Sequence, residues 1–153
     1  MLDMFTPHAF LNLLCEQAEL LERLIDSGQQ QQQTIEAGRM SELVAILGQK
    51  QPRLERLGAI GQQIQERRRE VEQSGFWPDE SVRRQCQTMR DRAAESFEHL
   101  IQLEQRCEQA LNTSREQIQQ RLQTIESSRH AASAYQSHAQ LPAPPRGDFS
   151  SVG

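Results

Sequence analysis

The most constraining feature of this sequence is a heptad rhythm that covers much of its length. In a heptad, apolar residues recur at alternating steps of three and four, which aligns them along one narrow side of a helix. The clearest run tolerates a few polar members and comprises Leu43, Leu47, Lys50, Leu54, Leu57, Gly61, Ile64, Arg68 and Val71. A chain with this pattern is expected to form long helices packed side by side, with little room for a deep catalytic pocket.

The composition favours a thin helical seam over a thick globular core. Of the 153 residues, 36% are hydrophobic and 5% aromatic, and glutamine is abundant, including the run from Gln29 to Gln33. Gln, Glu, Arg, Leu and Ala favour helix, whereas the β-branched and aromatic residues that favour strands are scarce. We therefore expect an all-α protein in which the glutamine run is helical rather than a linker.

Capping signals define the first two helices. Thr6 and Pro7 are typical of a helix start, and Gly38 is typical of the left-handed residue that follows a helix end. Ser41 is expected to cap the second helix. Pro52 removes one hydrogen bond from that helix, and we expect it to cause a kink rather than an end, because the heptads continue beyond it.

The one strong break follows at residues 73–79, where Gly75 and Pro78 interrupt the helical pattern. Asp79 or Ser81 can cap the third helix, which is expected to continue to about Ser137. The aromatic pair Phe76-Trp77 in the break is expected to close the end of the bundle; the alternative is a contact with a partner. Further apolar and tolerated heptad positions in the third helix are Val82, Cys86, Met89, Ala93, Phe97, Leu100, Glu104, Cys107, Leu111, Ser114, Ile118, Leu122 and Ile125.

The helix lengths leave two architectures open. At about 1.5 Å per residue, the first two helices would each span roughly 45–50 Å, and the third roughly 85–90 Å if unbroken. We predict an antiparallel bundle of three long coiled-coil-like helices, the third overhanging. The alternative is a break near Asn112–Ser114, where Thr113 and Glu116 have capping-box spacing, which would make a four-helix up-and-down bundle. Residues 1–138 are expected to form one bundle domain, and residues 139–153, rich in Pro, Gly and Ser, a disordered tail.

Charge and cysteine usage argue against several classes of protein. The formal net charge is −4, and acidic residues flank both basic clusters, Arg67–Arg69 and Arg83–Arg84, so nucleic-acid binding is not expected. The three cysteines lack CxxC spacing, which argues against a disulfide framework and a zinc site. Cys86 and Cys107 fall on the seam and are expected to be small core residues.

The chain also lacks the motifs of enzymes and membrane proteins. The sequence contains no nucleophile–base set, phosphate loop or metal cluster, so we expect neither an enzyme nor a cofactor or metal site. It has no apolar run long enough to span a membrane, and residues 1–9 do not have the character of a signal peptide. A soluble, cytoplasmic protein is expected.

A family resemblance begins where the first two helices join. An acidic, leucine-rich first helix leads through Glu36-Ala37-Gly38 to Leu43, Ile46, Lys50, Leu54 and Leu57. This order resembles the FlgN family of flagellar export chaperones, in which a small-residue turn precedes a helix with a lysine between leucines. The segment from Arg129 to Tyr135 is similar to the small-residue-plus-tyrosine segment at the end of that family. The resemblance spans roughly Leu13 to Tyr135.

The resemblance implies that the protein binds the C-terminal region of hook-associated (hook–filament junction) proteins in the cytoplasm and prevents their premature assembly. It places this contact in the C-terminal amphipathic helix, here at Leu111, Ile118, Leu122, Ile125 and Tyr135. The overhanging helix presents the same apolar stripe without a partner inside the bundle, and another amphipathic helix is its natural occupant. Contact with the export apparatus and the identity of the subunit are left open. The alternative is a homodimeric coiled-coil scaffold or adaptor with no export role.

Overall fold

The computed structural model describes residues 5–73 and 75–139, and within these ranges every regular element is a helix. The elements are α1 (Pro7–Glu36), α2 (Met40–Glu66), α3 (Arg68–Glu72) and α4 (Glu80–Ala139). The predicted all-α bundle is confirmed. The chain separates into two compact units, Met1–Ser114 and Arg115–Gly153, and each is described by itself below. The expected tail lies outside the described residues, except for Ala139.

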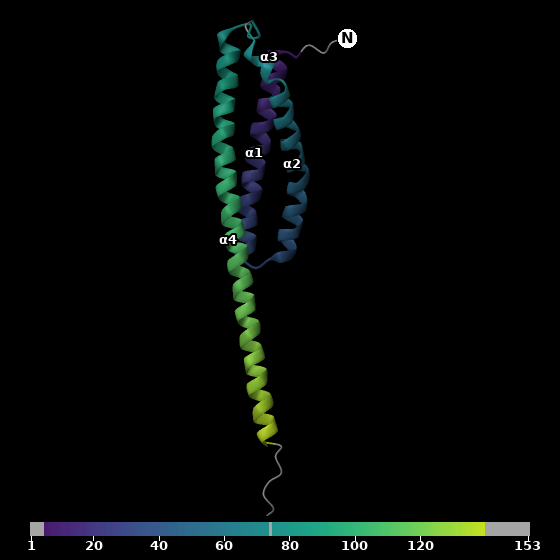
Figure 1. Cartoon of the computed structure of the whole chain (residues 1–153), viewed down its shortest axis with the longest axis vertical. Coiled ribbons are helices and arrows are strands. Elements are labelled where there is room, and N and C mark those ends of the chain that lie inside the picture. The colour runs from purple at the N-terminus through teal and green to yellow at the C-terminus, as the bar shows by residue number, and fades with distance from the viewer. Residues whose placement is uncertain (1–4, 74, 140–153) are drawn as a thin grey trace, which may run out of the picture. The chain divides into compact units, whose positions relative to one another are not determined.

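The first unit is a bundle of α1, α2 and the N-terminal part of α4. Helices α1 and α2 are antiparallel, and α4 starts at the end of the bundle where α1 begins (Figure 1). Leucines of all three helices meet in one buried layer, so that the core is a seam between helices and not a globule. Its buried members are Leu20, Leu21, Leu24, Leu57, Ile60, Ala93 and Leu100.

Both ends of α1 follow the sequence signals. The Thr6 hydroxyl accepts a hydrogen bond from the Ala9 amide at 3.1 Å, as an N-cap does. At the other end, Gly38 has a φ of 72°. The amides of Gly38 and Arg39 donate to the carbonyls of Ile35 and Thr34, each at 3.0 Å, which is the pattern of a Schellman cap. The glutamine run is helical throughout, as predicted.

The start of α2 differs from the prediction. The helix begins at Met40 with Arg39 as its N-cap residue, and no side chain caps it. The prediction of Ser41 as cap is wrong because the Schellman turn already directs the chain into a helix at Arg39, whose carbonyl accepts from the Leu43 amide at 3.1 Å. The helix does continue through Pro52. It ends at Glu66, and the short α3 follows after Arg67 and places Val71 in a buried cluster.

Helix α4 is one uninterrupted helix. Asp79 accepts a hydrogen bond from the Val82 amide at 3.0 Å just before it starts, so the predicted cap is confirmed. The helix passes through Asn112–Ser114 without a break, as the first of the two predicted architectures requires. Cys86 and Cys107 are buried, as predicted.

The aromatic pair of the 73–79 break closes one end of the bundle. Phe76 and Trp77 are half-buried and pack against a cluster that contains Phe10, Leu14 and Val82. The Trp77 ring meets Phe10 edge-on at 6.2 Å between centroids. The prediction that this pair seals the bundle is confirmed.

Helices α1 and α4 approach each other closely at Gly28. A Cβ atom at this position would lie 2.6 Å from Cδ2 and 3.0 Å from Cγ of Leu103, a buried core residue. The Cys107 thiol donates to the Gly28 carbonyl at 3.4 Å from the same side. Glycine is therefore required here by the packing of the two helices and not by its backbone conformation.

Replacing this glycine gives a direct test of the packing. We expect Gly28→Ala to destabilise the protein by about 1–3 kcal/mol, because Leu103 must leave its position in a filled core. Gly58→Ala is the matched control: the added Cβ meets nothing within 4 Å, so the better helix propensity of alanine should stabilise α2 by about 0.5–1 kcal/mol. Urea denaturation measures both. Two equal changes would contradict the close approach.

The cysteines provide a second test. Burial raises the pKa of the Cys86 and Cys107 thiols, whereas Cys15 is exposed. Since the thiolate is the reactive form, we expect a disulfide reagent at about pH 8 to label one thiol of the native protein rapidly and the other two only after unfolding in urea. Rapid labelling of two or three thiols in the native protein would contradict the packing of α4.

Candidate functional site

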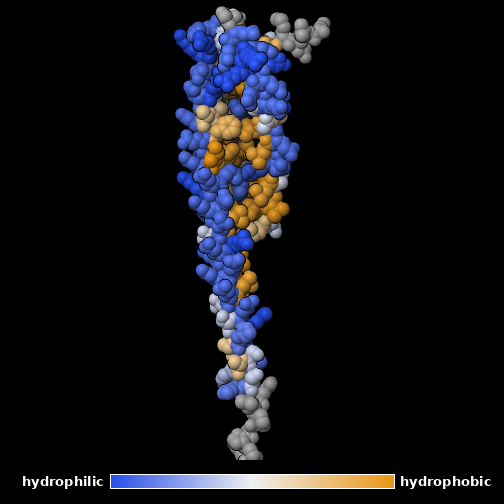
Figure 2. All heavy atoms as spheres, in the orientation of Figure 1, coloured by the Kyte–Doolittle hydropathy of each residue, from blue (hydrophilic) through white to orange (hydrophobic). Residues whose placement is uncertain are grey.

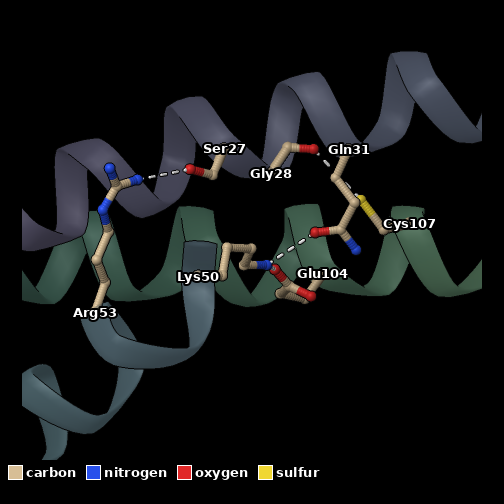
Figure 3. A network of polar contacts seen from close by, with 7 residues as sticks. All are labelled: Ser27, Gly28, Gln31, Lys50, Arg53, Glu104 and Cys107. Carbon is tan, nitrogen blue, oxygen red and sulfur yellow. Dashed lines mark hydrogen bonds and ion pairs between the residues drawn. The ribbon is translucent and has the colours of Figure 1, made fainter. Parts of the chain in front are cut away.

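The most deeply buried charge of the bundle is the ammonium group of Lys50, the one lysine of the chain. Lys50 is only 3% exposed. Its Nζ donates to Gln31 Oε1 of α1 at 2.9 Å and forms an ion pair with the Glu104 carboxylate of α4 (Figure 3). Nearby, Arg53 donates to the Ser27 hydroxyl at 3.1 Å. The network joins all three helices of the first unit at one level.

This network holds the bundle together and does not form a reaction centre. The Lys50 ammonium is enclosed and already bonded, and a second polar contact of α1 with α2 supports it. Among the described residues, no group of three or more His, Cys, Asp or Glu side chains could hold a metal ion. The candidate functional surfaces therefore lie outside the network, where apolar side chains face solvent.

The first such surface is on α4 in the second unit. We call Ile118, Leu122 and Ile125 the C-terminal stripe. Each is about half exposed, and their spacing of four and three residues places them on one face of the helix. Leu111, seven residues before Ile118, belongs to the first unit and is 37% exposed. Arg129, four residues after Ile125, ends the face with a positive charge.

Tyr135 does not share the face of the C-terminal stripe. It follows Ile125 by ten residues, which at 3.6 residues per turn rotates it about 80° around the helix. Its side chain is 78% exposed, the highest value among the large apolar and aromatic residues of the described chain. The predicted site residues thus fall into an apolar face and a separate tyrosine.

The second surface was missed by the sequence reasoning. We call Val44, Leu47 and Leu54 the α2 stripe. Leu47 and Leu54 belong to the predicted seam but are exposed. The buried residues in that part of the seam lie seven residues apart and are Leu43, Lys50 and Leu57. Leu54 is 41% and Val44 69% exposed. Within the described residues of the first unit, the neighbouring helices cover only part of the apolar face of α2.

Figure 2 shows apolar side chains gathered on one face of the first unit, between its long helices. Ile101 of α4 is also exposed, and Phe97, one turn before it, is half-buried against the core. An exposed apolar area of this kind marks a place where another molecule binds, because water leaves it at a gain in free energy.

A comparison with known protein families gives a match over most of the chain. The FlgN protein family matches the chain over residues 1–142. The chain belongs to the FlgN family. A search of curated proteins and a search of solved structures found no protein that matches this chain. FlgN proteins are flagellar export chaperones and not enzymes. None of the described helices of this FlgN protein is both long and apolar enough to cross a membrane.

The ion pair at Lys50 can be tested by removing its partner. Because the ammonium would then be buried with Gln31 alone, we expect Glu104→Ala to lower the free energy of unfolding by roughly 1–3 kcal/mol. Glu108→Ala, one turn further along α4 at an exposed position, is the control and should change it by less than about 0.5 kcal/mol. If thermal or urea unfolding gives the same result for both variants, the network does not hold the bundle.

Proposed function

We propose that this FlgN protein binds hook–filament junction proteins through the C-terminal stripe of α4 and keeps them unassembled in the cytoplasm until export. One observation carries the proposal: Ile118, Leu122 and Ile125 form an apolar face that no other described part of the chain covers. Leu111 and Tyr135 on the same helix are proposed as further contacts. Membership of the family supports the role of export chaperone, and the exposed apolar face supports the proposed place of contact.

The shape of the stripe defines what it can bind. Three apolar side chains within two turns of a helix match the apolar face of a second amphipathic helix, whose residues repeat at the same spacing. Such a face on a flagellar subunit would otherwise pair with another subunit. Covering it therefore prevents assembly without any covalent chemistry.

The affinity is expected to come from apolar burial. Each square ångström of apolar surface removed from water contributes about 25 cal/mol, before the cost of ordering both partners is subtracted. Arg129 lies at the C-terminal end of the apolar face, so its charge can determine the orientation in which a partner helix binds. A partner helix with an acidic residue beyond its apolar face would pair with this guanidinium group, which distinguishes the two possible orientations of the partner.

A charge placed inside the stripe tests the proposal. We expect Leu122→Asp to weaken binding to a purified hook–filament junction protein by at least about tenfold, because the contact would bury an unpaired carboxylate. Gln123→Asp is the matched control. It introduces the same side chain at the next residue, which points away from the stripe, and should bind like the unmodified protein.

Isothermal titration calorimetry measures the two affinities, and far-UV circular dichroism checks that both variants keep the helix content of the unmodified protein. If Leu122→Asp binds as tightly as Gln123→Asp, the contact lies elsewhere on the chain. If Leu122→Asp loses helix content, Leu122 is a core residue and the proposed binding face is wrong.

A further inference from the structure

Charged side chains are distributed unevenly around the described part of the second unit. Residues 115–139 contain three arginines and two glutamates. At 3.6 residues per turn, successive side chains are rotated by about 100°, so each charge can be placed relative to Ile118. Arg115 and Arg121 lie about 60° to either side of it, and Arg129 lies about 20° from it. The C-terminal stripe is thus bounded by a guanidinium group on each flank and at its C-terminal end.

The two glutamates lie on different sides of the helix. Glu116 is about 160° from Ile118, on the side opposite the stripe, whereas Glu126 is about 80° away, on the same flank as Arg115. The side chains of all three arginines and both glutamates are exposed. Three positive charges and one negative charge therefore surround the apolar face, and the remaining negative charge faces away from it.

The three arginines are available to a partner. Among the described residues, none of the ion pairs includes Arg115, Arg121 or Arg129. A guanidinium group carries five N–H donors in a planar fork, which fits a carboxylate through two parallel hydrogen bonds. A partner helix that packs on the stripe therefore meets unused donors on both sides of its apolar face.

Arg121 also belongs to a shallow hollow beside the stripe. The hollow is lined by Gln117, Gln120, Arg121, Thr124 and Ile125. The Thr124 hydroxyl donates to the Gln120 carbonyl at 2.9 Å, whereas the Arg121 guanidinium and the two glutamine amides present N–H donors at exposed positions. Because these donors lie next to the apolar Ile125 side chain, the hollow suits a carboxylate carried beside an apolar residue of a partner.

We infer that the C-terminal stripe selects amphipathic helices whose apolar face has carboxylates on both flanks. The inference rests on the proposed function, because it names the class of partner that the same stripe binds. Apolar burial stabilises the contact with any helix of matching spacing, whereas the flanking charges distinguish between such helices. A helix with basic flanks would place like charges opposite Arg115 and Arg121 and is therefore disfavoured.

Salt separates the contribution of charge from that of apolar burial. Ion pairs at exposed positions contribute modestly, and dissolved ions screen them. Burial of the Leu122 side chain is not screened in this way. The preference for an acidic helix is therefore expected to decrease as the ionic strength rises, while the requirement for Leu122 remains.

Two labelled amphipathic peptides test the inference on the full-length protein. They share one leucine face and differ only in the residues that flank it, which are glutamate in one peptide and lysine in the other. Fluorescence anisotropy measures their affinities for the unmodified protein and for Leu122→Asp, and only binding that Leu122→Asp removes is assigned to the stripe. At about 50 mM salt we expect the glutamate peptide to bind the stripe at least about tenfold more tightly, and this ratio to fall several-fold at about 500 mM.

Charge variants of the chain assign the preference to the flanks of the stripe. Arg121→Glu should weaken binding of the glutamate peptide about three- to tenfold at low salt and strengthen binding of the lysine peptide. Glu126→Gln and Glu116→Gln are a matched pair that removes the same charge beside the stripe and on the far side of the helix. Glu126→Gln should strengthen binding of the glutamate peptide about twofold or more, and Glu116→Gln should change it little.

Several results would overturn the inference. One is equal binding of the two peptides at the stripe, and another is a preference that survives both Arg121→Glu and Arg115→Glu. A third is binding of the stripe to vesicles that contain anionic lipid but to neither peptide, since the arginines would then contact a membrane surface. Far-UV circular dichroism checks the helix content of each variant, and Arg115→Glu repeats the test if Arg121→Glu loses helix.

A purified hook–filament junction protein separates this inference from the proposed function. If the peptides show the expected preference but the junction protein does not bind, the proposed function fails while the selectivity of the stripe stands. If the junction protein requires Leu122 but binds equally to the unmodified protein and to Arg121→Glu at low salt, the proposed function stands and the inference is wrong.

Discussion

The buried ammonium group of Lys50 is the constraint on which the bundle depends. A lone buried charge costs several kcal/mol, so the group must keep its oxygen partners on the two neighbouring helices. Gln31 of α1 and Glu104 of α4 supply them at one level of the bundle. If any helix slid by one turn, the ammonium would lose a partner, whereas leucines of a heptad seam could re-pair with other leucines. We infer that the network fixes the register of the helices, and that the register places Gly28 opposite Leu103.

A seam held in this way leaves apolar surface uncovered. Three helices surround a narrow core, and the apolar face of α2 is wider than its two neighbours can cover, so that Leu47 and Leu54 face solvent. The described part of the second unit, residues 115–139, is helical and has an apolar face of its own. The uncovered apolar surface suits a chaperone, because a surface that is covered within its own fold could not bind a subunit.

Local signals in the sequence predicted most of the fold. Gly38, the Asp79 cap and the Phe76-Trp77 closure depend on neighbours within a few residues, and all three were predicted correctly. The exposure of Leu47 and Leu54 was not, because a heptad shows which side of a helix is apolar but not how many helices cover that side. Lys50 and Glu104 are 54 residues apart in the sequence, and no local sequence pattern predicts that they pair. For the candidate site, the spacing of apolar residues along α4 was sufficient to find Ile118, Leu122 and Ile125. The helical repeat of 3.6 residues per turn places Tyr135 on a different face from these three residues.

We propose that the C-terminal stripe is the surface that binds the junction protein. Hydrogen–deuterium exchange of the full-length protein, with and without a purified hook–filament junction protein, tests this proposal residue by residue. We expect slower exchange on binding to be concentrated in residues 115–129 and to be largest around Leu122. Unchanged exchange in this segment, together with protection that appears only within α1 or α2, would contradict it.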